Sequence, residues 1–231
     1  CWEGADAFAI GPPATQAEYG TGGYRLHGAK TLVAGGAAAH ALIVPARIDA
    51  HRHGLFLVLA DAPGLQRETV GLVDGQRVAQ LRLDAAHAAQ LLFEAPPATI
   101  ADLLQAALDH ATVADCAQTV GTMQAAFDIT LEYTRTRKQF GHAIADNQVV
   151  QHRLVDLAVE IAEARALTRA AADMLGRTLP VRAAARQRMV AAARSCVATA
   201  ARLVWQDVVQ LHGAIGMTQE YVVGAFVQRL A

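Results

Sequence analysis

Two short polar segments carry side chains that could hold a ligand with phosphate groups. The first, residues 133–152, contains Arg137, Phe140 and Gln148. A guanidinium suits a diphosphate because it forms paired, charge-assisted hydrogen bonds, and an aromatic ring offers a face on which a planar group can stack. The alternative is structural, since Arg137 could simply cap the C-terminal end of a helix.

The second segment, residues 210–221, combines glycines with polar side chains where a long helix should end. Unpaired backbone N–H groups at helix ends can bind phosphate groups. Taken alone, Gly213 and Gly216 are explained more simply by a tight turn. His212 lies inside this segment and could touch a ligand, although a histidine stabilised by the helix dipole is the simpler account.

Residues 1–95 have the pattern of a β domain. Short runs with β-type residues are separated by turn residues such as Gly22-Gly23 and Asp74-Gly75. Strands spaced this closely predict a small antiparallel β barrel or sandwich. The predicted strands are 24–27, 31–33, 41–44, 54–59 and 90–93.

Residues 96–231 have the pattern of a helical domain, because the composition shifts to Ala, Leu, Gln and Arg and no proline occurs between Pro97 and Pro180. We predict helices at about 100–137, 148–177, 180–212 and from 218 onward. Long helices with short connections predict an antiparallel four-helix bundle, so the chain as a whole is predicted to be α+β.

Caps and an apolar stripe support these helices. Asp146 or Asn147 can cap the second helix. Pro180 suits the first turn of the third helix, and Thr218 can cap the fourth. In the second helix, apolar residues recur every three to four positions, which predicts that this face packs against another helix. The stripe consists of Val150, Leu154, Leu157, Ile161, Ala164, Ala171 and Leu175.

The composition favours a small organic ligand. Of 231 residues, 53% are hydrophobic and 18% are charged, and the formal net charge of -1 draws the chain neither to nucleic acid nor to an anionic membrane. Charged residues interrupt every apolar run well before the ~20 residues of a membrane span. The three cysteines and nine histidines lack the spacing of disulfide frameworks or metal ligands. We expect a soluble cytoplasmic protein with reduced thiols and no bound metal.

Both ends of the chain interrupt a predicted element. Cys1 is not an initiator Met and opens directly on what resembles a ligand-binding loop, so we expect further residues upstream. The fourth helix has barely begun when the chain stops at Ala231. We expect its far end to lie beyond that residue.

Together and in this order, the two polar segments resemble the helical domain of the acyl-CoA dehydrogenases. That family has an Arg-x-x-Phe-Gly segment, a Gln eight residues past the Phe, and a later Gln-x-x-Gly-Gly-x-Gly turn followed by an acidic-aromatic pair. The resemblance runs from about Thr112 to the C-terminus, and a second one covers residues 24–47, so the chain would lack the family's N-terminal helices. The matching residues of the helical part are Arg137, Phe140, Gly141, Gln148, Gln210, Gly213, Gly216, Glu220 and Tyr221.

The resemblance implies FAD as the cofactor and an acyl-CoA thioester as the substrate. Residues placed like Arg137 and Phe140 contact the diphosphate and adenine side of FAD across a subunit interface. Gln148 and the turn from Gln210 through Gly213 and Ala214 would do likewise for the neighbouring subunit's flavin. One chain would contribute to two sites, which implies a homo- or hetero-tetramer with a related subunit. An electron-transfer acceptor would reoxidise the flavin.

The resemblance leaves the catalytic base unassigned. The family removes an α proton with a carboxylate while a hydride passes from the β carbon to the flavin. Its two known locations for that carboxylate correspond to a loop beyond Ala231 and to Ala111. Asp115 lies one helical turn past Ala111 and about 40° off the same face. It is a candidate for the base, the alternative being an ordinary surface ion pair.

Further departures concern the flavin ring. Leu32 and Ala34 stand where many relatives have an aromatic residue and a Thr beside the ring. Residues 2–6 match the family's Glu-x-Gly-x-x-x-Asp loop only loosely, and Ala214 replaces a Gly where the backbone approaches the cofactor. Such losses resemble the smaller subunits of heteromeric acyl-CoA dehydrogenases, including those that act on dicarboxylyl-CoA or steroid side-chain CoA thioesters.

Three functions are therefore compatible with the sequence. The first is FAD-dependent α,β-dehydrogenation of an acyl-CoA thioester to the 2-enoyl-CoA, in fatty acid or steroid catabolism. The second is a base-lacking partner subunit that binds FAD and assembles with a catalytic subunit. The third is a flavin and oxygen enzyme, because nitroalkane oxidases and some monooxygenases resemble this fold. A helical interaction module without a cofactor is the remaining alternative.

Overall fold

The computed structural model describes residues 11–176, 183–218 and 221–231. The chain divides into two compact units, Cys1–Ala106 and Ala107–Ala231, which we name the β unit and the helical unit. Three sequence predictions fall outside the described residues. They concern the loop at residues 2–6, the helix start at Pro180 and the acidic residue Glu220.

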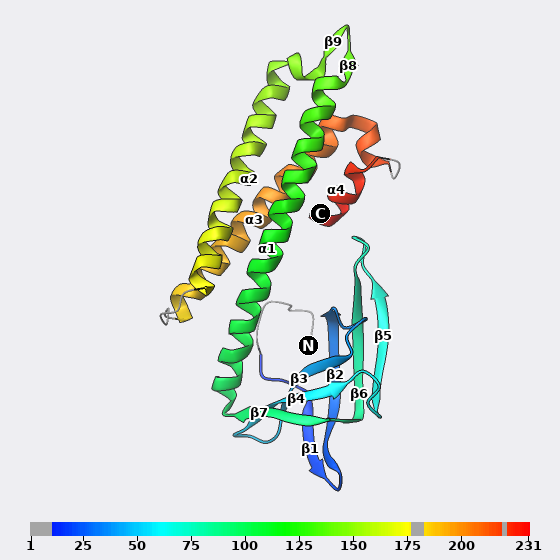
Figure 1. The fold of residues 1–231 in the computed structure, drawn as a ribbon, viewed down its shortest axis with the longest axis vertical. Helices are drawn as coiled ribbons and strands as arrows, with labels where there is room; N and C mark the ends of the chain where they lie inside the picture. The colour runs from blue at the N-terminus through cyan, green and yellow to red at the C-terminus, as the bar shows by residue number, and fades with distance from the viewer. Residues whose placement is uncertain (1–10, 177–182, 219–220) are drawn as a thin grey trace. The chain divides into compact units, whose positions relative to one another are not determined.

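One seven-stranded sheet makes up most of the β unit, in the order β5-β6-β2-β1-β3-β4-β7 (Figure 1). All neighbouring strands pair antiparallel except β1 and β3, which run parallel where Gln16 lies opposite Arg47. This pair departs from the all-antiparallel prediction. It arises because β1 folds back onto β2 at Gly20 and Gly23, leaving its other edge for β3. The strands are β1 (Gln16–Gly20), β2 (Gly23–Ala34), β3 (Ala41–Arg47), β4 (His53–Leu59), β5 (Leu65–Gly71), β6 (Arg77–His87) and β7 (Gln90–Ala95).

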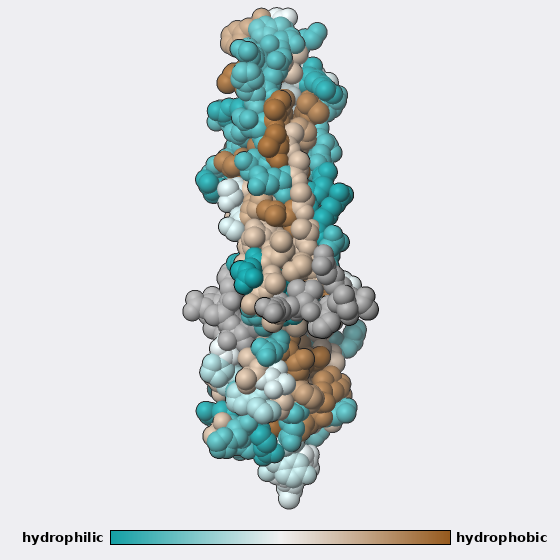
Figure 2. All heavy atoms as spheres, turned by 90° about the vertical axis from the view of Figure 1, so that its left-hand side faces the viewer, coloured by the Kyte–Doolittle hydropathy of each residue, from teal (hydrophilic) through white to brown (hydrophobic). Residues whose placement is uncertain are grey.

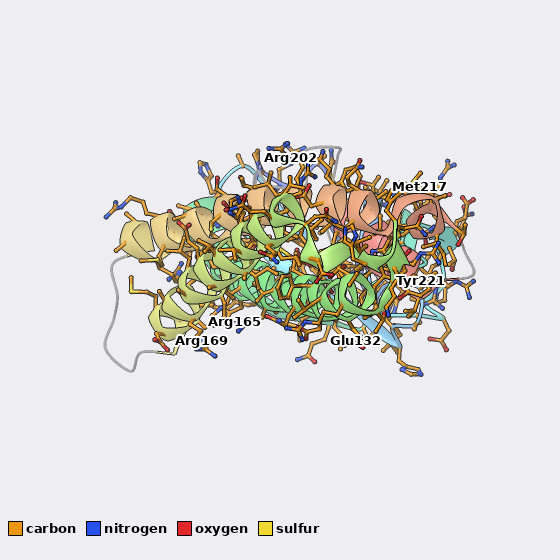
Figure 3. The ribbon with its side chains drawn as sticks, turned by 90° about the horizontal axis from the view of Figure 1, so that it is seen from above. Glu132, Arg165, Arg169, Arg202, Met217 and Tyr221 are labelled. Carbon is orange, nitrogen blue, oxygen red and sulfur yellow. The ribbon has the colours of Figure 1, made fainter. Side chains whose placement is uncertain are left out.

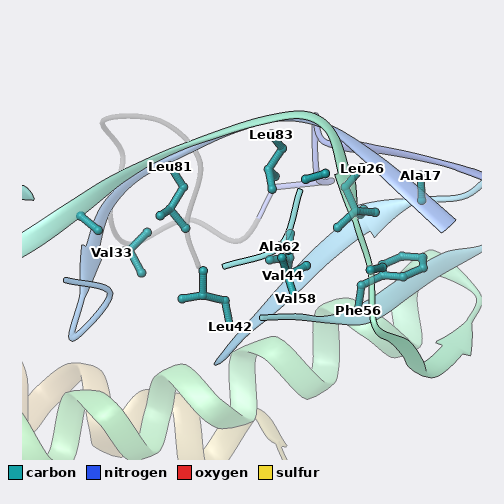
Figure 4. Close-up of a cluster of buried hydrophobic side chains, with 14 residues drawn as sticks. Ala17, Leu26, Val33, Leu42, Val44, Phe56, Val58, Ala62, Leu81 and Leu83 are labelled. Atoms are coloured by element: carbon teal, nitrogen blue, oxygen red, sulfur yellow. The ribbon is translucent and has the colours of Figure 1, made fainter. Parts of the chain in front are cut away.

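The core of the β unit lies between the two halves of this curled sheet (Figure 4). Leu26 and Leu83 come from β2 and β6, and Val44 and Phe56 come from β3 and β4. All four side chains are at most 3% exposed. Alternate residues of a strand point to the same face, so each strand contributes every second side chain to this core. Burial of a side chain of this size stabilises the fold by about 1.5–3 kcal/mol.

Three long helices and one short helix follow: α1 (Pro97–Thr136), α2 (Gln148–Leu175), α3 (Ala183–His212) and α4 (Val223–Leu230). The three long helices alternate in direction (Figure 1), as the sequence predicted. Met123, Ile161, Val204 and Val223, one from each helix, are at most 2% exposed in a shared core. The predicted α+β fold, a sheet followed by a helical bundle, is confirmed.

The apolar stripe predicted on α2 faces this bundle. The buried residues of α2 are Leu154, Leu157, Ile161, Ala164, Thr168 and Ala171. Thr168 joins the stripe although it is polar, because its hydroxyl donates a hydrogen bond to the carbonyl of Ala164 at 2.8 Å. A buried hydroxyl that is paired in this way costs little.

The fourth helix begins at Val223, later than predicted. Thr218 does not cap it; Thr218 instead ends the short 3-10 helix η2 (Gly213–Met217) in an extended conformation. Its hydroxyl donates back to the carbonyl of Ile215 at 2.9 Å, so it is already used by the preceding turn. The prediction of a cap at Thr218 was therefore wrong.

The described residues show no metal-binding cluster, since no group of three or more His, Cys, Asp or Glu side chains could hold an ion. None of the described helices is both long and apolar enough to cross a bilayer. Cys116 and Cys196 are free thiols, and burial raises the pKa of both. A raised pKa keeps a thiol protonated and hence a poor nucleophile.

Candidate functional site

The first predicted segment forms a β-hairpin with a two-residue turn directly after α1. Its strands are β8 (Lys138–Gln139) and β9 (His142–Ala143), and Phe140 and Gly141 form the turn with φ angles of 54° and 87°. Such a turn normally carries Asn or Gly at its first position, because other side chains are strained at positive φ. Phe140 occupies it with a side chain that is 98% exposed. Neither packing nor turn preference within the chain explains this residue.

Arg137 joins α1 to the hairpin. Its N–H donates to the carbonyl of Tyr133 at 2.8 Å, and its own carbonyl accepts from the N–H of Ile144 at 3.0 Å. These bonds hold the backbone on both sides of the turn, while the side chain is exposed. A fixed backbone with an exposed guanidinium is a preorganised anion-binding group.

Gln148 is the first residue of α2 and is also exposed. Asn147 occupies the N-cap position, as predicted, but its side chain makes no capping bond. Its amide donates instead to the carbonyl of Ile144 at 3.0 Å, and Asp146 accepts from the N–H of Ala143 at 3.1 Å. Both side chains therefore stabilise the connection between the hairpin and α2. Neither caps the backbone N–H groups in the first turn of α2.

The second predicted segment ends α3 and continues as η2. Gln210, Gly213 and Ala214 are exposed, and Gly213 has a φ of 64°. Gly216 is buried, and a Cβ built on it would lie 2.9 Å from the Cβ of His212. The turn therefore requires glycine at 216 for space and favours it at 213 for backbone conformation.

Three rings connect the two segments. Tyr133 stacks on His212 with ring centroids 4.4 Å apart, and Tyr221 lies 5.3 Å from His212 and 6.1 Å from Tyr133. The Tyr133 hydroxyl also lies 3.4 Å from the carbonyl of His212. Met217 and Tyr221 both follow α3 (Figure 3); Met217 is 75% exposed, whereas Tyr221 packs against the bundle core. The structure thus brings the end of α1 and the end of α3 together.

The sequence did not predict this ring cluster. His212 was explained there by the helix dipole, which stabilises the charged imidazolium. Its side chain is in fact only 4% exposed, and burial lowers its pKa. The only signal was the co-occurrence of aromatic residues in both segments, Tyr133 in one and Tyr221 in the other.

A hollow of about 330 Å³ opens beside the turn. It is lined by Gly216, Met217, Thr218, Gly224, Ala225, Val227 and Gln228. None of the six residues predicted to bind a cofactor lines it. Those residues, Arg137, Phe140, Gln148, Gln210, Gly213 and Ala214, all lie on the exposed surface of the helical unit.

The candidate for the catalytic base is exposed. Asp115 and Ala111 both lie on the solvent side of α1. The other nearby carboxylate, Asp109, is buried and accepts a hydrogen bond from Nε of Arg186 at 2.7 Å. Asp109 is therefore engaged in joining α1 to α3.

Leu32 has an unusual backbone conformation in the β unit. It has a φ of 48°, is 50% exposed, and lies at a register shift in the pairing of β2 with β6. Next to it, Lys30 is only 1% exposed, and its Nζ donates to the carbonyl of Pro45 at 2.9 Å. A bulge that turns an apolar side chain outward often marks a functional surface.

The comparison with protein families decides the assignment. The family model described as "Acyl-CoA dehydrogenase, C-terminal domain" matches residues 101–230, which is more than half of the chain. This chain belongs to the acyl-CoA dehydrogenase family. The matched region contains both segments described above.

Individual relatives and solved structures are similar over nearly the whole of this chain. An acyl-CoA dehydrogenase of Bacillus subtilis is 28% identical over 94% of this chain. The solved ChsE4-ChsE5 complex of Mycobacterium tuberculosis is 29% identical with a TM-score of 0.80 over 96% of the chain. A glutaryl-coenzyme A dehydrogenase solved with glutaryl-CoA is 26% identical with a TM-score of 0.83 over 98%. The chain spans 60%, 58% and 57% of these three proteins, respectively.

Proposed function

We propose that the protein binds FAD and takes part in the α,β-dehydrogenation of an acyl-CoA thioester to the 2-enoyl-CoA. The observation that carries the proposal is the strained hairpin turn that holds Phe140 in solvent beside Arg137. Strain of this kind persists where a function requires it. In a family of acyl-CoA dehydrogenases, a cofactor contact is that function.

The donor set fits the diphosphate and adenine portions of FAD. Arg137 would pair with the diphosphate, and Phe140 would stack on a planar ring. Gln148 and Gln210 would donate amide hydrogen bonds, and the backbone at Gly213 and Ala214 would approach the cofactor closely. When bound, FAD supplies the hydride acceptor for the β carbon of the substrate.

The exposure of all six residues also supports a site shared between chains. A cofactor of this size is usually buried over most of its surface. The described hollow beside the turn does not include these residues, so a second chain would have to cover the ligand. We propose that this chain is a homo- or hetero-oligomer subunit that supplies part of a neighbour's site.

An apolar strip on the helical unit supports the same proposal (Figure 2). Val149, Val155 and Val159 of α2 are 63%, 61% and 59% exposed. Val155 and Val159 lie on the side of α2 opposite its buried residues, whereas Val149 lies nearer to the buried side. Exposed apolar residues gathered on one face are typical of protein interfaces.

Cofactor titration tests the proposal. FAD is added to the cofactor-depleted protein and its fluorescence is followed as it binds. We expect Arg137→Ala to weaken binding by about 10- to 100-fold, because a charged hydrogen bond contributes about 1.5–3 kcal/mol. We expect Phe140→Ala to weaken it by about 3- to 10-fold through the loss of stacking.

Arg202 on α3 provides the matched control, since it is an exposed arginine outside both segments (Figure 3). Arg202→Ala should bind FAD like the wild type. All three variants should melt within a few degrees of the wild type, because the altered side chains are exposed. Equal FAD affinity in all four proteins would contradict the proposed site.

A partner subunit without its own base is the second candidate function. It is favoured by the exposure of Asp115 and by Ala111, which leave α1 without a buried carboxylate at this position. The solved ChsE4-ChsE5 assembly, a complex by its name, is among the similar structures. Acyl-CoA oxidation with an artificial electron acceptor separates the two candidates. Turnover by the purified protein alone favours the first, and turnover only after adding a related subunit favours the second.

A further inference from the structure

His212 is wedged between two tyrosines at the point where α3 becomes η2. Its side chain is 4% exposed, with Tyr133 of α1 stacked on one side and Tyr221 5.3 Å away. Gly216 of η2 packs directly on its Cβ. One imidazole therefore contacts α1, the turn after α3, and the segment that leads into α4.

The hydrogen bonds of His212 define its tautomer. Nδ1 lies 2.8 Å from the carbonyl of Val208, which can only accept a hydrogen bond. Nδ1 therefore carries the proton and Nε2 keeps a lone pair. Nε2 is buried and has no hydrogen-bond partner among the described residues.

The surroundings keep this ring neutral. Burial lowers the pKa of His212 from its usual 6.5, and the hydrogen bond to Val208 opposes that shift only in part. Among the described residues, the ionisable side chains that contact its ring are the phenols of Tyr133 on α1 and Tyr221 before α4, and neither is a carboxylate. A proton on Nε2 would be a buried charge with no counter-ion among these contacts. Attraction to the tyrosine rings offsets such a cost only partly.

We propose that neutral His212 is a positioning residue that holds the 213–217 turn against the end of α1, and that a proton taken up at Nε2 releases the turn. The reaction is a simple protonation by solvent, and no bond other than N–H forms or breaks. The expected effect on FAD rests on the proposed function, because the released turn carries Gly213 and Ala214. Bound FAD would then be lost as the pH falls.

The protonation itself is tested on the wild-type protein by NMR titration. We expect the His212 ring resonance to titrate below 6.5, the usual pKa of a histidine. The unfolded state binds the proton more readily than the folded state, so the stabilisation by His212 is complete above pH 6.5 and declines as the pH falls below it. A His212 resonance titrating at or above 6.5 would overturn the proposal.

The variant His212→Phe keeps an aromatic ring between the tyrosines and cannot titrate. We expect the wild-type melting temperature to fall between pH 7 and 5 relative to this variant, with the folded-to-unfolded ratio changing by at most about tenfold per pH unit. His40→Phe is the control and should follow the wild type. Parallel profiles for wild type and His212→Phe would contradict the role of His212.

FAD release completes the test and separates this inference from the proposed function. We expect FAD to dissociate faster from the wild type at pH 5.5 than at pH 8, and His212→Phe to lack this dependence. A protein that never binds FAD would contradict the proposed function, while the melting profiles would still decide the role of His212. FAD release that depends on pH equally in both proteins would contradict the release step alone.

Discussion

Phe140, Leu32 and Ala85 are the non-glycine residues with positive φ among those described. Each costs roughly 1–3 kcal/mol of backbone strain. All three are exposed, and the family resemblance places Phe140 beside the diphosphate and adenine portions of FAD. Since core packing does not offset strain at an exposed side chain, we attribute the strain at Phe140 to its proposed contact with FAD.

The buried ion pair between Asp109 and Arg186 should dominate the stability of the helical unit where the first half of α1 meets the start of α3. Asp109→Ala leaves the guanidinium of Arg186, whose side chain is only 20% exposed, without its carboxylate at 2.7 Å. Breaking a buried pair in this way costs about 3 kcal/mol or more. We expect a clear drop in the melting temperature by calorimetry.

The pair between Arg153 and Asp207 is the matched control. Its two charged atoms are also 2.7 Å apart, but the side chains are 44% and 29% exposed. Exposed pairs contribute about 0–1 kcal/mol, so Arg153→Ala should shift the melting temperature little. An equal shift in both variants would mean that burial of Asp109 does not increase the contribution of its ion pair to stability.

At the residue scale, the sequence proposed site residues that the structure leaves exposed, but it did not predict the contacts that support them. Arg137 and Phe140 stand out because their types and spacing match a short motif. The stacking of Tyr133 on His212 joins residues far apart in the chain, and helical periodicity gives no information on such contacts. Asp109 lies two residues before Ala111 and about 200° around the helix from it, and in the structure it is engaged by Arg186.

At the element scale, the turn after α3 depends on its glycines for different reasons. A Cβ at Gly216 would lie 2.9 Å from the Cβ of His212 and 3.2 Å from the carbonyl of Val209. Overpacking of this kind costs about 1–3 kcal/mol. We expect Gly216→Ala to lower the melting temperature and to weaken FAD binding, because η2 must move.

Gly121 offers the opposite case within α1. A Cβ there meets nothing within 4 Å, and alanine favours a helix over glycine by about 1 kcal/mol. Gly121→Ala should therefore raise the melting temperature and leave FAD affinity unchanged. A loss of stability in Gly121→Ala would show that α1 is packed at this position by something outside the chain.

The sequence predicted the helices well and the strands only in part. All five predicted runs lie within observed strands. Four of them contain buried apolar residues, and in the run 90–93 the partly buried Leu91 packs against the core. β5 was missed since most of its residues are polar and exposed, as an edge strand permits. β1 and β6 were missed because polar residues interrupt their apolar ones. The late start of α4 depends on the hydroxyl of Thr218 bonding backward, which residue type alone does not determine.

At the scale of the whole molecule, the helical unit presents two surfaces that the chain does not cover itself. One carries the six proposed cofactor residues, and the other carries the exposed Val155 and Val159 of α2. A single copy leaves both in solvent. An oligomer would bury both. The proposed FAD site therefore depends on the proposed assembly.

The absorbance spectrum and native mass of the purified complex test this claim most directly. The account predicts a yellow complex whose mass corresponds to more than one chain, and in which Arg137→Ala loses flavin absorbance but keeps the oligomeric mass. A second, larger polypeptide in that complex would favour the heteromeric candidate. A colourless monomer that gains no flavin when FAD is added would contradict the account.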